Sequence, residues 1–176
     1  MSVFDNIYLT GFRASGKTTL GLEISRLSGF VFLDTDHKLQ EEAGISIKTF
    51  VQRHGWDCFR DLEENILSRT AFSSGLVVAT GGGAVLRQSN RDILKNKRFL
   101  TVYLKASPDL ILERLGKDPN PAQRPPLSER SMEDEIVENL IQREPLYQEC
   151  ADMVLEAGQS AGKMAVRVME KLSVSV

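Results

Sequence analysis

Cysteine is scarce in this chain of 176 residues, and an excess of basic charge is absent. The two cysteines, Cys58 and Cys150, lie far apart and lack the close spacing of metal ligands, so we expect neither a disulfide framework nor a zinc site. Lysine and arginine number 22 against 24 aspartates and glutamates, which gives a net charge of −2. Such a chain has no overall basic field for nucleic acid or an anionic membrane, and neither partner is expected. A net charge this close to zero is still compatible with a small, local anion-binding site.

Long apolar runs are absent too. No run approaches the roughly 18 residues that a membrane-spanning helix needs, and neither end has the basic-then-apolar pattern of a signal segment. We therefore expect a cytoplasmic protein. A monomer is also expected, although no sequence pattern reports the oligomeric state. Hydrophobic residues make up 41% of the chain and charged residues 26%, a composition that suits a globular domain with a hydrophobic core. The chain is too short for two domains of ordinary size. The prediction is a single domain over residues 1–176.

The most informative segment is GFRASGKT, residues 11–18, in which two glycines enclose four residues and are followed by Lys17 and Thr18. It follows an apolar run and opens a helical pattern, which is the context that a phosphate-binding loop requires. Inward-pointing N–H groups, a tight glycine turn and the positive end of a helix dipole all favour bound phosphate. An ordinary glycine turn before a helix is the alternative.

This loop predicts an ATP site with Mg²⁺. Lys17 would neutralise the β- and γ-phosphates, and the Thr18 hydroxyl would coordinate the metal. The predicted ATP-binding residues in and just after the loop are Gly11, Ala14, Ser15, Gly16, Lys17, Thr18 and Thr19.

Apolar runs and helical spacings alternate along the chain. Strands are predicted at residues 6–10, 30–34, 76–80, 98–104 and 153–155. Helices are predicted at residues 17–28, from 35 to about 43, and at about 46–54, 57–72, 90–95, 108–116, 132–143 and 161–172, with Pro145 disturbing the helix before it. Residues 117–126 hold four of the six prolines and suit neither helix nor central strand. The alternation predicts an α/β fold, with a mainly parallel sheet covered by helices on both faces.

Three segments follow the first three predicted strands and meet at the C-terminal edge of the sheet, where ligands of such folds bind. They are the phosphate loop, Asp34 with Asp36, and Gly81–Gly83. If the strand continued through Asp36, both aspartates would point to one face; one could support the metal and the other accept a hydrogen bond from a hydroxyl. A turn or a helix cap is the alternative. The glycines form either a flexible turn or a backbone surface for a small ring.

Three arginines suit anion binding. Because most arginines in a globular protein are solvated, an ordinary surface position is the alternative for each. Arg124 lies in the proline-rich segment, which has the character of a mobile lid that supplies positive charge to a transferring phosphoryl group. Arg60 and Arg143 suit bidentate recognition of a carboxylate, a geometry that lysine cannot copy. His37 and His54 have no partner visible in the sequence.

Six motifs, in this order along the chain, closely resemble the shikimate kinase family. They are GFRASGKT, the DTD of residues 34–36, the cluster of Gly55-Trp56, Phe59-Arg60 and Glu63, ATGGG at residues 79–83, Arg124-Pro125, and REPLY at residues 143–147. The resemblance covers about residues 6–154. It implies a three-layer P-loop kinase fold like that of the nucleoside monophosphate kinases, with a five-stranded parallel sheet, substrate-binding helices at about 35–72 and a lid at about 116–127.

The same resemblance implies an activity and a substrate site. The ATP γ-phosphoryl group would pass to the 3-hydroxyl of shikimate, giving shikimate 3-phosphate and ADP in the chorismate pathway to the aromatic amino acids. Asp36 would hold that hydroxyl and act as its base. Arg60 and Arg143 would bind the shikimate carboxylate, with Glu63 orienting Arg60. Gly81, Gly82 and Gly83 would lie along the ring.

On the nucleotide side, the resemblance implies that Thr18 ligates Mg²⁺ with Asp34 nearby through water. Arg124 would contact the ATP phosphates from the lid, and Arg114 is the candidate for stacking on adenine. The implied catalytic residues are Lys17, Asp36 and Arg124.

Two other functions share parts of this pattern. A related small-metabolite kinase, such as a gluconate kinase, has the phosphate loop and an anionic sugar-like substrate, but does not need this set of DTD, FR and GGG. A nucleotide-binding module could sense ATP without catalysis. The presence of Lys17, Thr18, Asp36 and Arg124 argues against the second function.

Overall fold

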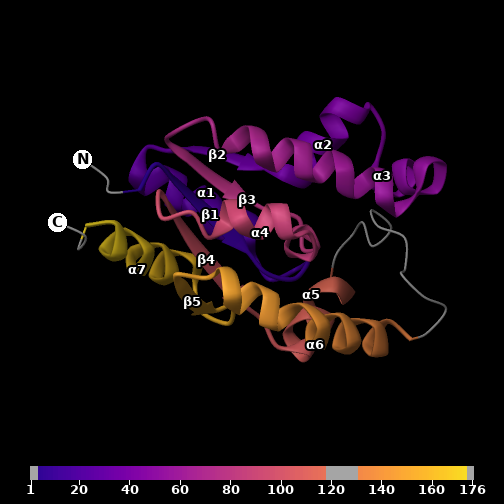
Figure 1. Ribbon diagram of the computed structural model, residues 1–176. Coiled ribbons are helices and arrows are strands. Elements are labelled where there is room, and N and C mark those ends of the chain that lie inside the picture. The colour runs from indigo at the N-terminus through magenta and orange to yellow at the C-terminus, as the bar shows by residue number, and fades with distance from the viewer. Residues whose placement is uncertain (1–3, 118–130, 174–176) are drawn as a thin grey trace.

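Parallel strands form the centre of the computed structural model, which describes residues 4–117 and 131–173 (Figure 1). The strands are β1 (Asn6–Thr10), β2 (Val31–Asp34), β3 (Leu76–Ala79), β4 (Phe99–Lys105) and β5 (Met153–Glu156). The helices are α1 (Lys17–Ser28), α2 (Thr35–Ala43), α3 (Ile47–Thr70), the 3₁₀ turn η1 (Ala84–Leu86), α4 (Gln88–Leu94), α5 (Pro108–Gly116), α6 (Met132–Cys150) and α7 (Ala161–Ser173). Within these residues the strands make one five-stranded sheet of order β2-β3-β1-β4-β5, with every pairing parallel. The predicted α/β fold is confirmed.

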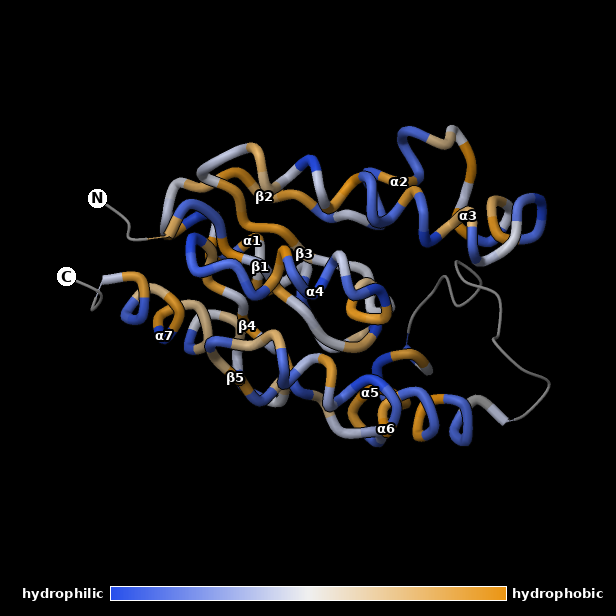
Figure 2. Tube along the Cα trace, viewed as in Figure 1, coloured by the Kyte–Doolittle hydropathy of each residue, from blue (hydrophilic) through white to orange (hydrophobic). Residues whose placement is uncertain are grey.

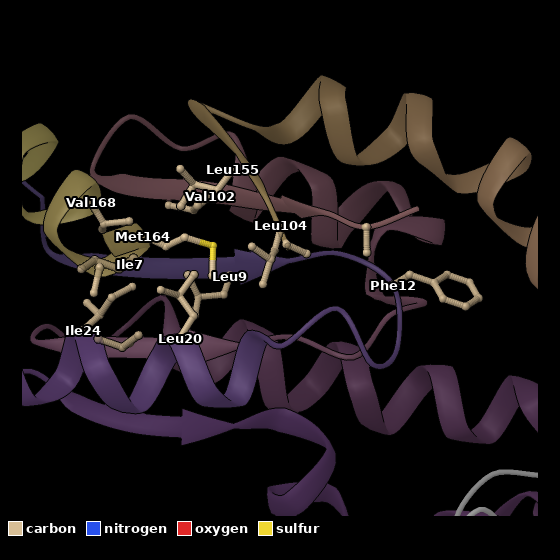
Figure 3. Close-up of a cluster of buried hydrophobic side chains, with 14 of the residues drawn as sticks. Ile7, Leu9, Phe12, Leu20, Ile24, Val102, Leu104, Leu155, Met164 and Val168 are labelled. Atoms are coloured by element: carbon tan, nitrogen blue, oxygen red, sulfur yellow. The ribbon is translucent and has the colours of Figure 1, made fainter. Parts of the chain in front are cut away.

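The central strand β1 is buried along its whole length, and its side chains alternate between two cores. Ile7 and Leu9 face the core beneath α1 and α7, where Leu20 and Met164 join them (Figure 3). Tyr8 points to the opposite face. There it packs with residues of α3, α4 and α6, namely Leu67, Leu94, Tyr147 and Cys150. Helices therefore cover both faces, which explains why the strands read as apolar runs.

Helices α2 and α3 build a smaller core of their own beyond the edge strand β2, from Leu39, Phe59, Ile66 and their neighbours. Figure 2 shows the mixed hydropathy along α3 and α6, in contrast with the hydrophobic stretches of β2 and β3. Gly55, with φ 82° and ψ 170°, interrupts the helical geometry of α3. The two helices expected at 46–54 and 57–72 are therefore two segments that meet at this glycine.

Helix α2 begins at Thr35, directly after Asp34, so β2 ends where the sequence predicted and does not continue through Asp36. The Asp34 carboxylate accepts hydrogen bonds from the N–H groups of Asp36 and His37, at 3.0 and 3.3 Å, and so caps the helix. Asp36 consequently lies in the first turn of α2. The predicted helix cap is therefore present at Asp34, through its Oδ1 atom.

Helix α6 continues through Pro145 to Cys150, so the prediction that it ends near Arg143 was wrong. A proline inside a helix removes one hydrogen bond to the carbonyl four residues earlier, here that of Ile141. Ile141 is 71% exposed, so water can satisfy its carbonyl, while the buried side chains of Arg143 and Tyr147 hold the helix on both sides of the proline. No helix among residues 4–117 and 131–173 combines the length and apolar character needed to cross a bilayer.

Candidate active site

The loop between β1 and α1 has the backbone of an anion cradle. Gly11 and Gly16 have φ of 143° and 102°, a region that other residues rarely adopt. A Cβ at Gly11 would also lie 2.6 Å from the Leu104 carbonyl oxygen, so the loop passes too close to β4 for any side chain. Ala14 has a positive φ of 59°, which is uncommon outside glycine and marks a constrained turn. The loop conformation is thus set by its sequence and by β4.

Lys17, the first residue of α1, is buried, and its ammonium group lies against the loop. Its Nζ donates hydrogen bonds of 2.8 Å to the carbonyl oxygens of Gly11 and Phe12. This positive charge adds to the positive end of the α1 dipole, so the loop concentrates favourable potential for an anion.

Thr18 and Asp34 bring a hydroxyl and a carboxylate together beside the loop. Thr18 Oγ1 donates to Asp34 Oδ2 at 3.0 Å, while Asp34 Oδ1 caps α2. Oxygen ligands of these two kinds fit Mg²⁺, which usually binds one or two carboxylates together with phosphate oxygens and water. No group of three or more His, Cys, Asp or Glu suited to a metal occurs among the described residues, so a metal here would depend on phosphate for much of its coordination.

A cavity of about 580 Å³ opens over this loop. Lys17, Thr18, Asp34 and Asp36 all line it, which brings the phosphate loop and the predicted base into one space. The remaining lining residues are Arg13, Ala14, Ser15, Gly16, Thr19, Thr80, Arg114, Leu115, Ala157, Gln159, Ala161 and Met164. The segment after β5 contributes four of these residues, and sequence reasoning missed it. Its one available signal was its position behind a strand at the C-terminal edge of the sheet.

Arg114 of α5 joins three parts of the cavity wall. Its Nη1 donates to the carbonyl oxygens of Ala14 and Ser15, at 3.0 and 2.6 Å, and its Nη2 donates to that of Ala157 at 2.8 Å. The residue suggested by resemblance for adenine thus lies in the cavity and ties the phosphate loop to the segment after β5.

Arg60 and Glu63 of α3 form a largely buried ion pair next to the glycine segment Gly81–Gly83. The Arg60 guanidinium also lies 5.0 Å from the ring centre of Phe59 and 5.6 Å from that of Trp56. A Cβ at Gly83 would overlap this guanidinium, and one at Gly81 would overlap the Glu63 carboxylate and lie 2.9 Å from Asp36 Oδ1. The glycines therefore give room to the side chains of Arg60, Glu63 and Asp36.

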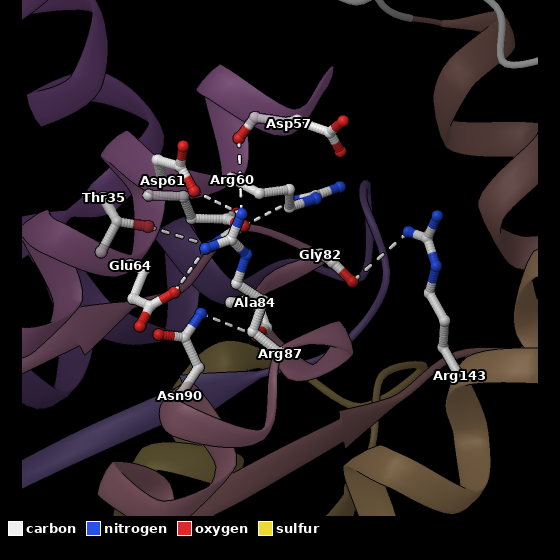
Figure 4. A network of polar contacts seen from close by, with 12 residues as sticks. Thr35, Asp57, Arg60, Asp61, Glu64, Gly82, Ala84, Arg87, Asn90 and Arg143 are labelled. Carbon is white, nitrogen blue, oxygen red and sulfur yellow. Dashed lines mark hydrogen bonds and ion pairs between the residues drawn. The ribbon is translucent and has the colours of Figure 1, made fainter. Parts of the chain in front are cut away.

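Arg143 reaches the same glycine segment from α6. Its Nη1 lies 3.4 Å from the Gly82 carbonyl oxygen, and the Tyr147 hydroxyl donates to that oxygen as well. Figure 4 shows Arg60 and Arg143 approaching the glycine segment from different elements. The two guanidinium groups thus meet at neighbouring residues, Gly82 and Gly83.

Not every predicted site residue shares the cavity. Arg60, Arg143 and the glycine segment are not among the described residues that line it; Asp36 links the two regions, because it lines the cavity and also packs against Gly81. Arg124 and most of the expected lid, residues 118–127, lie outside the described residues.

Comparison with known proteins gives a consistent result. The family model described as shikimate kinase matches residues 13–173. A shikimate kinase 2 of Yersinia enterocolitica is 40% identical over 167 residues, which covers 95% of each chain, and a shikimate kinase of Nitratidesulfovibrio vulgaris is 40% identical over 149 residues, 85% of each. A solved shikimate kinase from Acinetobacter baumannii, in complex with shikimate, is 35% identical with a TM-score of 0.90 and covers 98% of this chain and 96% of its own. The chain belongs to the shikimate kinase family.

Proposed function

We propose that the enzyme binds ATP over the phosphate loop and shikimate beside Asp36, and transfers the γ-phosphoryl group to the 3-hydroxyl to give shikimate 3-phosphate and ADP. The observation that carries this assignment of the site is the single cavity lined by both Lys17 and Asp36. Phosphoryl transfer asks a protein mainly for alignment and charge neutralisation, and a cavity lined by both a cation and a carboxylate supplies both.

On the nucleotide side, the loop N–H groups and Lys17 hold the β- and γ-phosphates, and Arg114 contacts the adenine end. Thr18 and Asp34 are the residues that would hold Mg²⁺, which neutralises phosphate charge when bound. Their 3.0 Å contact supports this pairing. Arg124 is proposed to contact the phosphates as well, and this role rests only on the sequence motif that contains it.

On the acceptor side, Asp36 holds the 3-hydroxyl and accepts its proton as the oxygen attacks phosphorus. Its place in the first turn of α2 supports this role, because the capped helix end fixes the carboxylate next to Gly81. A base must lie within hydrogen-bond reach of the proton that it removes. The Asp36 side chain lines the cavity over the phosphate loop and also packs against Gly81, next to the glycines that the two arginines contact.

Arg60 and Arg143 bind the carboxylate of shikimate. Their guanidinium groups converge on adjacent glycines, and Glu63, itself almost fully buried, anchors Arg60 by an ion pair. Two planar guanidinium groups at adjacent residues match a carboxylate better than lysines would. The relative from Acinetobacter baumannii, solved with shikimate, supports the choice of acid.

We further propose a monomeric enzyme in the cytoplasm. Cys58 and Cys150 are both free in the structure, as expected in a reducing compartment.

An assay of ADP release tests the substrate. ATP and Mg²⁺ are supplied with shikimate, gluconate or a nucleoside monophosphate in parallel, and we expect turnover with shikimate alone. Preference for gluconate would overturn the acceptor assignment. ATP binding without turnover of any acceptor would indicate a nucleotide-sensing module instead.

The carboxylate contact has a sharper test. Arg60→Met and Arg143→Met should each weaken shikimate binding by roughly 2 to 5 kcal/mol, with Arg167→Met on the exposed face of α7 as the matched control. A shikimate analogue whose carboxylate is replaced by a hydroxymethyl group should bind the wild-type enzyme weakly, and the two variants should weaken it little further. Equal losses with shikimate and with the analogue would refute the carboxylate assignment.

A further inference from the structure

The Gly82 carbonyl oxygen is held from α6 by two side chains. The Tyr147 hydroxyl donates the shorter hydrogen bond, and Arg143 Nη1 lies farther away at 3.4 Å. Tyr147 is fully buried, and its ring stacks on that of Tyr103 with centroids 5.0 Å apart and an interplanar angle of 22°. A hydrogen bond from a buried, stacked ring has a fixed direction, so it can fix the position of the peptide that accepts it.

Asn139, Arg143 and Tyr147 follow one another at intervals of four residues and therefore share one face of α6. We call these three residues the α6 stripe. Arg143 Nη2 donates to Asn139 Oδ1, and Asn139 Nδ2 donates to the Glu135 carbonyl oxygen at 2.7 Å. The Nη2 atom of Arg143 is thus held by Asn139, one helical turn earlier. Its Nη1 atom contacts the Gly82 carbonyl oxygen, which Tyr147 also holds.

Gly82 also touches the phosphate loop. A Cβ on Gly82 would lie 3.2 Å from Arg13 N and 3.5 Å from the Gly11 carbonyl oxygen. The peptide therefore lies between the loop and the α6 stripe, with little space on the loop side. A change in how α6 holds Gly82 must be taken up by Arg143 or by the glycine segment, rather than by movement into the loop.

We infer that Tyr147 and Asn139 are positioning residues for the acid substrate: together they fix the Arg143 guanidinium at the glycine segment in the orientation that receives a carboxylate. Tyr147 acts by holding the Gly82 carbonyl, and Asn139 by accepting a hydrogen bond from Nη2. The inference rests on the proposed function in one respect, namely that Arg143 binds the substrate carboxylate.

Steady-state kinetics of Tyr147→Phe test the inference. This variant keeps the ring and removes the donor, and we expect KM for shikimate to rise about 5- to 20-fold, the scale of one buried hydrogen bond, while KM for ATP and kcat change by less than about twofold. The matched control is Tyr103→Phe, which removes a hydroxyl from the stacked partner ring but takes no donor from Gly82, and its KM for shikimate should stay at the wild-type value. Equal KM values in Tyr147→Phe and wild type would overturn the inference.

Asn139→Leu is the second variant, in case Tyr147→Phe does not fold. Asn139 is only partly buried, so the change is tolerable for α6, and it removes the acceptor for Nη2. KM for shikimate should rise about fivefold, again without a matching change for ATP. If KM for shikimate and KM for ATP rise together, or if neither rises, the positioning role of Asn139 is contradicted.

A double-mutant cycle separates this inference from the proposed function. If the α6 stripe acts through Arg143, then adding Tyr147→Phe or Asn139→Leu to Arg143→Met should change KM for shikimate no further. Independent, multiplying effects would show that the two residues act elsewhere and would overturn the inference. An unchanged KM in Arg143→Met alone would instead overturn the carboxylate assignment of the proposed function.

Discussion

The Thr18 hydroxyl donates to Asp34 Oδ2 at 3.0 Å, although the strands that precede these residues, β1 and β2, are separated in the sheet by β3. The contact forms because both strands end at the same edge, where the sheet order changes direction around β1. Asp34 divides its two oxygens between Thr18 and the N-terminus of α2. One carboxylate therefore supports both the proposed metal position and the helix that carries Asp36.

Asp34→Asn should separate these two tasks. Asparagine caps helices about as well as aspartate, so thermal stability should change little, whereas loss of the charge should weaken Mg²⁺ binding. We expect the Mg²⁺ concentration for half-maximal activity to rise about tenfold. Asp34→Ala should add a loss of about 1 kcal/mol in unfolding free energy, measured by urea denaturation. An unaltered Mg²⁺ requirement in both variants would exclude Asp34 from the metal site.

Lys17→Ala should abolish most turnover. Removing one cation from the transferring phosphates should lower kcat by about 10²- to 10³-fold, as measured by ADP release at saturating substrates. Circular dichroism should show an intact fold. Lys171→Ala, at the exposed C-terminal end of α7, removes the same charge away from the cavity and should keep wild-type kcat. Near-normal turnover in Lys17→Ala would contradict the assignment of the loop.

Gly83→Ala should displace Arg60 without unfolding the protein. The new methyl group would overlap the guanidinium, which is the flexible end of a side chain and can move away. KM for shikimate should therefore rise about tenfold or more, because the arginine loses its position. Gly158→Ala is the control, since a Cβ there meets nothing within 4 Å. Equal KM values for shikimate in the two alanine variants would contradict the claim that Gly83 makes room for Arg60.

The two thiols should differ in reactivity. Burial raises the pKa of Cys150 to about 11, and the residue is 3% exposed, whereas Cys58 is exposed. Because the thiolate is the reactive form, a raised pKa keeps Cys150 protonated and inert at pH 8. One thiol per native chain should react with a disulfide reagent at pH 8, and two after denaturation. Since the folded pKa lies above the unfolded one, the stability that neutral Cys150 contributes is present below pH 8.5 or so and is lost as the pH rises toward 11. Two fast thiols in the native enzyme would contradict this picture.

Much of the fold was predictable because its signals are local. The run Asn6–Thr10 and the glycines of the phosphate loop specify a buried strand and a tight turn within a few residues of chain. Asp34 was harder, because a strand continuing to Asp36 and a helix cap fit the same DTD sequence. Burial of Arg143 and Tyr147 allows α6 to continue through Pro145, and local propensity does not contain that contribution.

The site was predictable where a motif holds several functional residues together. Lys17, Thr18 and Asp36 fall in such motifs and do share a cavity. The cavity wall after β5, formed by Ala157, Gln159, Ala161 and Met164, carries no motif, because these residue types occur in many other settings. The link from Arg114 to Ala14 joins residues 100 positions apart and depends on how α5 packs, which the sequence pattern does not report.

The order of the strands also affects when the sheet can fold while the protein is being synthesised. Asn6 of the central strand pairs with Leu76 on one side and Phe99 on the other, and the turn at Gly11 passes close to the Leu104 carbonyl oxygen. Strand pairings so distant in sequence close late, because the long intervening loops cost entropy. The phosphate loop therefore packs against a strand that is synthesised much later than the loop itself, and we expect it to take its working shape only once β4 has joined the sheet.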